Sequence, residues 1–127
     1  MIQIGTHLNV LDNSGAKKAI CLRVYGYNKK IASIGDLVLV SVRSLRNCNR
    51  SSSRVKKGEL YKALIIRSKV FFKNKFTQTC KTTFCENAIV LLNKQNKLIG
   101  TRIFGPVPKL IRYTRFLRLA AVSSGVV

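Results

Sequence analysis

Acidic residues are scarce in this chain of 127 residues, which contains only Asp12, Asp36, Glu59 and Glu86. Histidine is scarcer still, because His7 is the only one. General acid–base and nucleophilic catalysis depend on positioned carboxyl and imidazole groups, and no acid pair or Ser/Cys/His set is recognisable around His7. The composition therefore argues against an enzyme, and we expect His7 to be an ordinary surface or strand residue.

Long apolar runs are also missing. No stretch of about 18 uncharged apolar residues occurs, because Lys or Arg interrupts every apolar run. The start Met1–Ile4 does not have the pattern of a signal peptide. We therefore expect a soluble protein with no membrane partner and no secretory address.

The four cysteines, Cys21, Cys48, Cys80 and Cys85, follow no regular spacing. Cys80 and Cys85 could form half of a metal site, but the other half would have to come from two cysteines that are far apart in the sequence. Nothing else in the chain indicates an oxidising compartment. We expect four free thiols, no structural metal and no cofactor.

Basic residues, in contrast, are abundant. The chain has 24 Lys and Arg residues and a formal net charge of +20, while 46% of its residues are hydrophobic. The apolar fraction is enough for a core, so the charge coats a folded protein and not a disordered tail. A chain of this length supports one core, and we expect a single domain over residues 1–127 that needs an anionic partner.

Most of the chain shows the composition of β-strands. The expected strands are rich in Val, Ile, Leu and Tyr and are bounded by turn residues: His7–Asp12, Ala19–Tyr25, Leu37–Arg43, Leu60–Val70 and Ala88–Leu92. The residues Asp12-Asn13-Ser14-Gly15 predict a tight turn between the first two strands. Short strands in this number favour a small closed barrel over about residues 1–107, which removes exposed edges. A β-sandwich is the alternative.

Two segments predict basic extensions from the barrel. Ser44–Gly58 has few large apolar groups, and we expect a basic loop that becomes ordered on an anionic partner. Phe71–Phe84 interleaves aromatic residues with lysines, which fits a hairpin arm or a stacking surface for bases. We expect Phe84 to belong to the core.

After Pro108 the pattern becomes helical, over about residues 108–122. A continuous helix would place Leu110, Tyr113, Leu117 and Ala120 on one face and Arg112, Arg115 and Arg118 on the other. We expect the apolar stripe to pack on the barrel. The arginine face could follow a phosphate backbone, or it could simply be solvated.

The cations are spread through many turns and loops, which suits a partner that wraps several faces. Folded RNA does this, whereas a membrane presents one plane. The expected RNA-binding residues are Lys17, Lys18, Lys29, Lys30, Arg43, Arg46, Arg50, Arg54, Lys56, Lys57, Lys69, Lys73, Lys75, Arg112 and Arg115. The alternative is a free-standing single-stranded-RNA-binding or RNA-chaperone barrel that stacks bases on Tyr25, Tyr27, Phe71, Phe72 and Phe76.

Several ordered motifs carry a resemblance to a known family. They are Met1–Ala16 with its Thr-His-Leu-Asn-Val and Asp-Asn-Ser-Gly-Ala elements, Gly35-Asp36, Val55–Glu59, the Phe84-x-x-Asn87-x-x-Val90-Leu91 pattern, and Ile99–Val107, which reads IGTRIFGPV. Along essentially its whole length the chain resembles the universal large-subunit ribosomal protein fourteen family, in its bacterial and organellar form.

That resemblance implies a five-stranded barrel with a basic hairpin and short C-terminal helices, bound to large-subunit rRNA. It also implies an exposed side, including Thr101 and Arg102, that meets small-subunit rRNA in an intersubunit bridge. Further implied partners are neighbouring large-subunit ribosomal proteins and the ribosome-silencing factor. We expect Gly15, Gly100 and Gly105 to permit tight turns or close approach of RNA, and Ile103 and Phe104 to anchor their segment in the core.

The chain departs from the family pattern in four places. Thr79–Lys81 replaces the usual turn before Phe84, and Cys85-Glu86 replaces an Asp-Gly step. The loop Arg46–Arg54 is longer, and the C-terminus ends differently. The shortage of acids, the abundance of Lys, Asn, Ile and Phe, and a start without a transit peptide predict synthesis inside a mitochondrion, with a plastid or a bacterial cytoplasm as alternatives.

Overall fold

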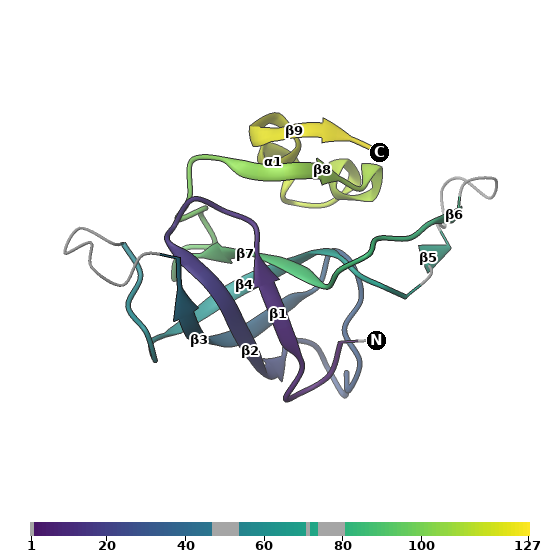
Figure 1. Ribbon diagram of the computed structural model, residues 1–127. Helices are drawn as coiled ribbons and strands as arrows, with labels where there is room; N and C mark the ends of the chain where they lie inside the picture. The colour runs from purple at the N-terminus through teal and green to yellow at the C-terminus, as the bar shows by residue number, and fades with distance from the viewer. Residues whose placement is uncertain (1, 47–53, 71, 74–80) are drawn as a thin grey trace.

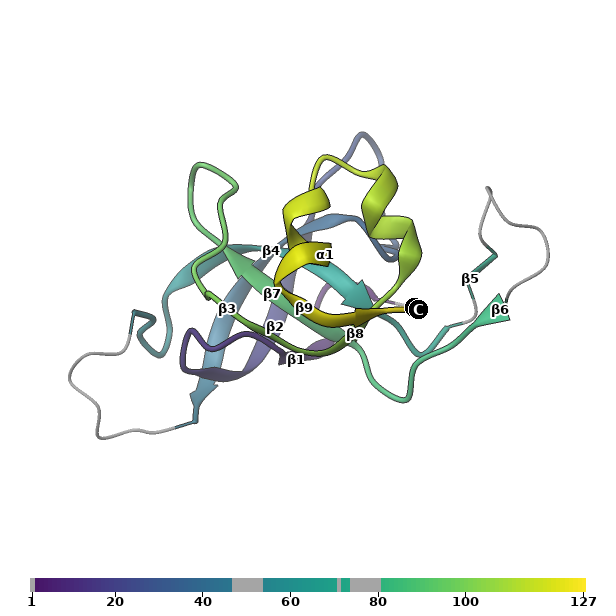
Figure 2. The same ribbon diagram turned by 90° about the horizontal axis from the view of Figure 1, so that it is seen from above.

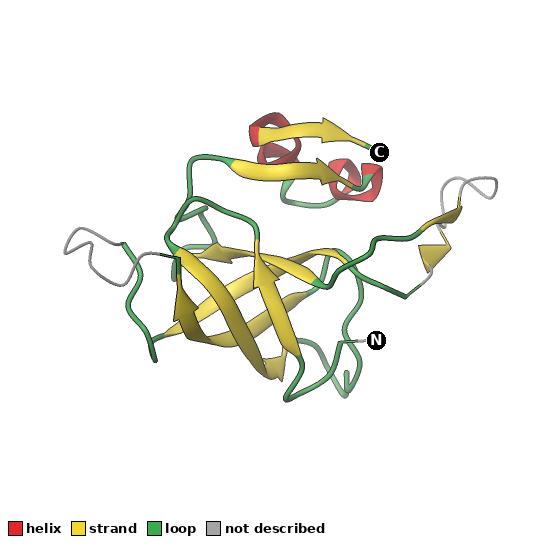
Figure 3. Cartoon of the chain, in the orientation of Figure 1, coloured by secondary structure: helices red, strands yellow, loops and turns green. Residues whose placement is uncertain are grey.

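The computed structural model describes residues 2–46, 54–70, 72–73 and 81–127. Within these ranges the chain is mostly strand, as Figure 3 shows. The strands are β1 (His7–Val10), β2 (Ala16–Val24), β3 (Leu37–Leu45), β4 (Leu60–Arg67), β5 (Phe72–Lys73), β6 (Lys81–Thr82), β7 (Ala88–Leu92), β8 (Ile103–Val107) and β9 (Ser123–Val126). A 3-10 helix, η1 (Lys109–Tyr113), and one short helix, α1 (Leu117–Val122), lie between β8 and β9.

Five strands close into a barrel in the order β1-β2-β3-β4-β7 (Figure 1). All neighbours are antiparallel except β1 and β7, which run parallel and close the barrel. The prediction of a five-stranded barrel is confirmed, and the β-sandwich alternative is wrong. Closure pairs both edges of every barrel strand, which removes the open edges that a small sheet would otherwise expose.

The turn between β1 and β2 forms around the buried carboxylate of Asp12. Its Oδ1 accepts a hydrogen bond from the amide of Ser14 at 3.0 Å, and its Oδ2 accepts one from the amide of Leu91 in β7 at 2.9 Å. Gly15 completes the turn with a φ of 103°. The predicted tight turn is confirmed, and the buried charge is tolerated because its oxygens are hydrogen-bonded.

The outer face of β7 is covered by residues 103–127, which we call the C-terminal unit. Figures 1 and 2 show this unit lying over the barrel at β7. Leu92 of β7 lines a cleft together with Phe116 and Leu119 of the C-terminal unit. All five residues of β7 are therefore buried, and the strand is continuously apolar instead of alternating.

The C-terminal segment contains two short helices, η1 and α1, as the family resemblance implied, and not the single helix on which the apolar and arginine faces were placed. It divides at Thr114, whose amide and hydroxyl both donate to the carbonyl of Ile111. Ile111 and Leu119 are buried, whereas Tyr113 and Leu117 are 62% and 59% exposed. The predicted apolar stripe is therefore only partly present: Leu110 packs against the core, but Tyr113 and Leu117 face solvent. A 3-10 turn has about 3 residues per turn, and the break shifts the helical phase. The sequence analysis also missed β9, which pairs parallel with β8.

The predicted loop Ser44–Gly58 is shorter than expected, since Ser44 and Leu45 belong to β3. Val55 is fully buried, and Arg54 donates to the carbonyl of Ile99 at 2.9 Å, so the end of the loop is anchored to the barrel. Residues 47–53 lie outside the described residues. The hairpin arm is present as β5 paired with β6, extending from the barrel in Figure 1, but residues 71 and 74–80 are not described.

Candidate nucleic-acid interface

Strand β2 presents two neighbouring lysines on the same side of the barrel. Adjacent residues of a regular strand point to opposite faces, so one of Lys17 and Lys18 would normally face the core. The pairing of β2 with β3 shifts register on both sides of Lys18. Such bulges re-aim side chains, and both lysines are exposed.

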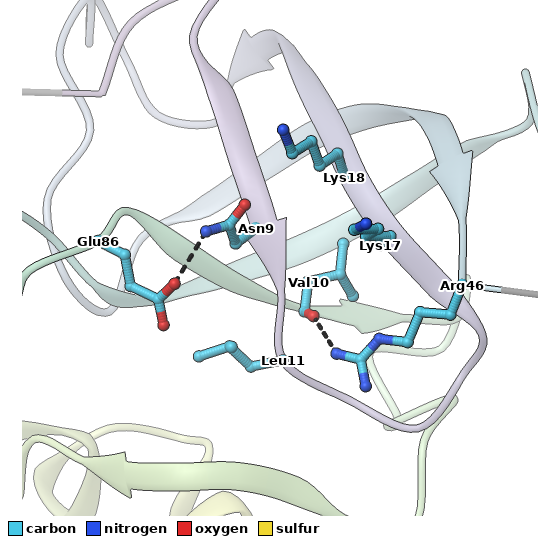
Figure 4. Close-up of a pocket in the computed structure, with 7 residues that line it drawn as sticks. All are labelled: Asn9, Val10, Leu11, Lys17, Lys18, Arg46 and Glu86. Carbon is cyan, nitrogen blue, oxygen red and sulfur yellow. Dashed lines mark hydrogen bonds between the residues drawn. The ribbon is translucent and has the colours of Figure 1, made fainter.

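Lys17 and Lys18 border a hollow of about 500 Å³ on the outside of the barrel. The hollow, which we call the cationic groove, is lined by Asn9, Val10, Leu11, Lys17, Lys18, Arg46 and Glu86 (Figure 4). Arg46 follows β3 and is oriented by two contacts. Its Nη2 donates to the carbonyl of Val10 at 2.9 Å, and its guanidinium lies 4.8 Å from the centroid of the Phe104 ring.

Glu86 is the only acidic residue that lines the cationic groove, and its carboxylate is already engaged. Its Oε2 accepts from Asn9 Nδ2 at 2.8 Å (Figure 4). Its Oε1 accepts from Arg67 Nη1 at 2.9 Å. Among its described lining residues, the groove thus has three cationic side chains against one neutralised carboxylate. This arrangement suits phosphate oxygens, which Lys and Arg contact with charge-assisted hydrogen bonds.

Arg67, at the end of β4, is a residue that the sequence analysis missed. It is only 8% exposed, in contrast to the surface cations that were expected to bind RNA. The signal that could have found it is its place directly after the apolar run Ala63–Ile66, where a cation must find partners inside the protein.

The other expected RNA-binding cations are spread over the surface away from the cationic groove. Lys29, Lys30, Arg43, Arg54, Lys56, Lys57, Lys69, Arg112 and Arg115 are exposed. Lys29 Nζ lies 2.6 Å from Asp36 Oδ1, so part of its charge is compensated. Arg50 and Lys75 lie outside the described residues, and of Lys73 only its position in β5 is described.

Thr101 and Arg102 are exposed and are held against the β1–β2 turn by Asn13. Asn13 Oδ1 accepts from the amides of Thr101 at 2.7 Å and Arg102 at 3.2 Å. Asn13 Nδ2 donates to the Thr101 hydroxyl at 2.8 Å. Both side chains are thus presented to solvent from a fixed backbone.

Of the two residues expected to anchor this segment, only Ile103 does so, at 4% exposure. Phe104 is 43% exposed, and the expectation for it was wrong. The next residue in a strand points the other way, so the strand that buries Ile103 turns Phe104 outward, where Arg46 covers its ring.

Comparison with known families agrees with this architecture. The model of the ribosomal protein L14p/L23e family matches residues 1–127, the whole chain. The chain belongs to this family. It is therefore a structural constituent of the large ribosomal subunit and not an enzyme, and its place is on the ribosome.

The aromatic residues that the chaperone alternative would use for base stacking differ in their exposure. Tyr27 is 98% exposed and Tyr25 is half-buried, while the side chains of Phe71, Phe72 and Phe76 are not described. Phe84 packs against the core, as predicted, and its ring centroid lies 5.7 Å from the Arg67 guanidinium.

The cysteines of this L14p/L23e protein occupy contrasting positions. Cys21 is buried, and burial raises the pKa of its thiol, while Cys85 is exposed. Cys48 and Cys80 lie outside the described residues. Among the residues that the structure describes, no group of three or more His, Cys, Asp or Glu side chains could hold a metal ion.

His7 is an exposed residue of β1, as expected. The helices among the described residues are all too short or too polar to span a membrane.

Proposed function

We propose that this L14p/L23e protein binds large-subunit rRNA and that the cationic groove is one of its phosphate-binding sites. The observation that carries the proposal is the exposure of Lys17 and Lys18 side by side next to Arg46. Each neutralised phosphate releases condensed counterions, which is the main driving force for sequence-independent binding to RNA. Arg46 is already held in place, so it loses little side-chain entropy on binding.

The remaining expected cations serve the same RNA from other sides. Those that the structure describes lie in the β2–β3, β3–β4 and β4–β5 connections, on β3 and β5 and in the C-terminal unit, so they suit RNA that wraps the barrel. Shape and backbone contacts are the usual basis of recognition of folded RNA. In this proposal the whole chain, residues 1–127, acts as one ribosomal-protein domain, with the barrel in about 1–107 and the helical segment in about 108–122.

We further propose that Thr101 and Arg102 contribute to the intersubunit face and meet small-subunit rRNA. Their exposure and their rigid attachment through Asn13 support this role, since a bridge residue should be ordered before the subunits join. The same face could receive the ribosome-silencing factor. Neighbouring large-subunit proteins are further proposed partners, reached through strand pairing.

We place the protein in the mitochondrial ribosome, with plastid and bacterial ribosomes as alternatives. The support is compositional: four acids against 24 basic residues in a Lys-, Asn-, Ile- and Phe-rich chain.

The test is sedimentation of tagged protein from lysed cells and from isolated mitochondria. A ribosomal component should migrate with the large subunit through a gradient at moderate salt and be enriched in the mitochondrial fraction. Protein that stays at the top of the gradient, but is recovered bound to diverse single-stranded RNAs, would indicate the chaperone alternative and contradict the proposal.

A further inference from the structure

One buried guanidinium joins the barrel to the C-terminal unit. Arg67 lies at the end of barrel strand β4, yet its donors reach carbonyls of β8, which pairs with β9 outside the barrel. Arg67 Nη2 donates to the carbonyl of Phe104 at 2.8 Å. Its Nε donates to the carbonyl of Pro106 at 2.9 Å.

The same guanidinium is paired with a carboxylate. Arg67 Nη1 lies 2.9 Å from Glu86 Oε1, and the side chain of Arg67 is 10% exposed against 35% for Glu86. A buried cation without a partner is strongly unfavourable. Glu86 therefore neutralises the Arg67 guanidinium, whose two-pronged set of N–H donors we call the fork, and orients it toward β8. The other carboxylate oxygen of Glu86 accepts a hydrogen bond from Asn9 in the cationic groove.

The backbone of β8 fits closely around this fork. Gly105, between the two accepting carbonyls, has a φ of 80°, a region that side chains other than glycine rarely adopt. A Cβ at Gly105 would collide with Arg67 Nη2. The site thus has a donor fork, a neutralising carboxylate and a glycine that admits the fork to the backbone.

We propose that Arg67 and Glu86 are positioning residues that hold the segment Thr101–Val107 at a fixed place on the barrel. Asn13 secures one end of this segment, at Thr101 and Arg102, and Arg67 secures the other. The pair thereby sets where Arg102 stands relative to the cationic groove. The functional part of this inference rests on the proposed role of Arg102 at the intersubunit face.

The first experiment measures amide hydrogen exchange in the isolated protein. Arg67→Met removes the fork, and Glu86→Gln removes its neutralising charge. Loss of about 1.4 kcal/mol of local stability would accelerate exchange about tenfold. We expect at least this acceleration at the amides of Phe104 and Val127, which donate to Leu11 and Val107 respectively.

The amides of Cys21 and Tyr25, which are bonded within the barrel region, should exchange at the wild-type rate. Lys29→Met is the matched control, since it removes the other described ion pair, with Asp36, and should leave the Phe104 amide unchanged. Equal acceleration throughout the protein would mean that the Arg67–Glu86 pair only stabilises the whole fold. No acceleration at Phe104 would mean that the pair does not hold the segment Thr101–Val107. Either result overturns the inference.

Gly105→Ala tests the same contact without altering a charge. In the wild-type background the new methyl group should collide with Arg67 and accelerate exchange at Phe104. In the Arg67→Met background the collision is relieved, while the backbone strain at this φ remains the same. The substitution should therefore have a smaller effect in the second background, and equal effects in both would contradict a contact through Arg67.

The second experiment follows assembly in gradients. Large subunits that contain Arg67→Met should retain the protein but form fewer joined ribosomes. Lys94→Met, which alters an exposed lysine outside the proposed RNA-binding residues, should be normal. Normal joining despite faster exchange at Phe104 would overturn the positioning role. If wild-type protein does not migrate with large subunits, the proposed function fails, but the exchange experiment still decides whether Arg67 holds β8.

Discussion

Asn13 organises an exposed segment that is remote from it in the sequence. Its side-chain amide accepts from the amides of Thr101 and Arg102 and donates to the Thr101 hydroxyl. Amide side chains can satisfy donors and acceptors at the same time, which suits them to fix a loop on a turn. At this position a single side chain fixes the backbone amides of two proposed contact residues.

Close packing at Gly100 depends on the same turn. A Cβ on Gly100 would lie 2.8 Å from both Asn13 Oδ1 and Asp12 Cβ. We expect Gly100→Ala to lower the free energy of unfolding by about 1–3 kcal/mol, because the turn must shift to admit the methyl group. Urea unfolding measures this effect.

Gly125→Ala is the control for Gly100→Ala, since nothing lies within 4 Å of its added Cβ. It should change the free energy of unfolding by less than about 0.5 kcal/mol. Equal effects of the two substitutions would mean that packing against the turn is unimportant.

The two described cysteines should differ in reactivity. Burial raises the pKa of the Cys21 thiol, so it holds less of the reactive thiolate, and it is also shielded from reagents. We expect iodoacetamide at pH 8 to modify Cys21 at least about tenfold more slowly than exposed Cys85 in the folded protein. Peptide-resolved mass spectrometry follows both sites. The difference should vanish in denaturant, and similar rates in the folded protein would contradict the burial of Cys21.

At the scale of elements, β2 shows how an irregular strand can serve binding. Its register shifts allow Lys17 and Lys18 to face solvent together, whereas a regular strand would turn one of them inward. The barrel provides the rigid frame, and the local irregularity provides the cationic surface.

Lys17→Ala/Lys18→Ala should reduce the salt dependence of binding to large-subunit rRNA. If each lysine neutralises one phosphate, the slope of log affinity against log salt should fall by about 1.4–1.8 in magnitude. Titrations at stepped KCl concentrations measure the slope.

Lys94→Ala/Lys97→Ala is the matched control for the β2 lysines. These lysines are also exposed, but they lie between β7 and β8 and do not line the cationic groove. An unchanged slope for the β2 variant, or an equal loss in the control, would remove the cationic groove as a preferred phosphate site.

At the scale of the whole molecule, the barrel carries cations on several sides, while Arg102 is exposed directly before the C-terminal unit. We expect Arg102→Glu to leave the protein in large subunits, because many other cations remain. Subunit joining should weaken by about 1–3 kcal/mol, since repulsion replaces a charged hydrogen bond to phosphate. Gradient sedimentation of the purified subunits, mixed at stepped magnesium concentrations, measures the joining equilibrium.

Arg102→Lys preserves the charge and should retain most of the joining. Loss of the Arg102→Glu protein from large subunits, with normal joining of those that keep it, would instead assign Arg102 to rRNA of its own subunit.

The sequence by itself determined the features that depend on neighbouring residues and on total composition. A high content of Val, Ile, Leu and Tyr between turn residues located the barrel strands, with β7 matching Ala88–Leu92. Composition determined the basic character, and the ordered motifs indicated the family to which the chain belongs. These properties follow from short-range preferences, so they can be read without a structure.

Only the tertiary structure decided how distant residues combine. Arg67 donates to the carbonyls of Phe104 and Pro106, and its partner Glu86 also accepts from Asn9. No local sequence pattern predicts these contacts. The outward position of Phe104 depends on β8 pairing with β9 instead of entering the barrel. The exposure of both Lys17 and Lys18 depends on bulges against β3. Each of these positions depends on contacts between segments that are far apart in the chain. Local propensities reflect only neighbouring residues, so they cannot predict the energies of such contacts.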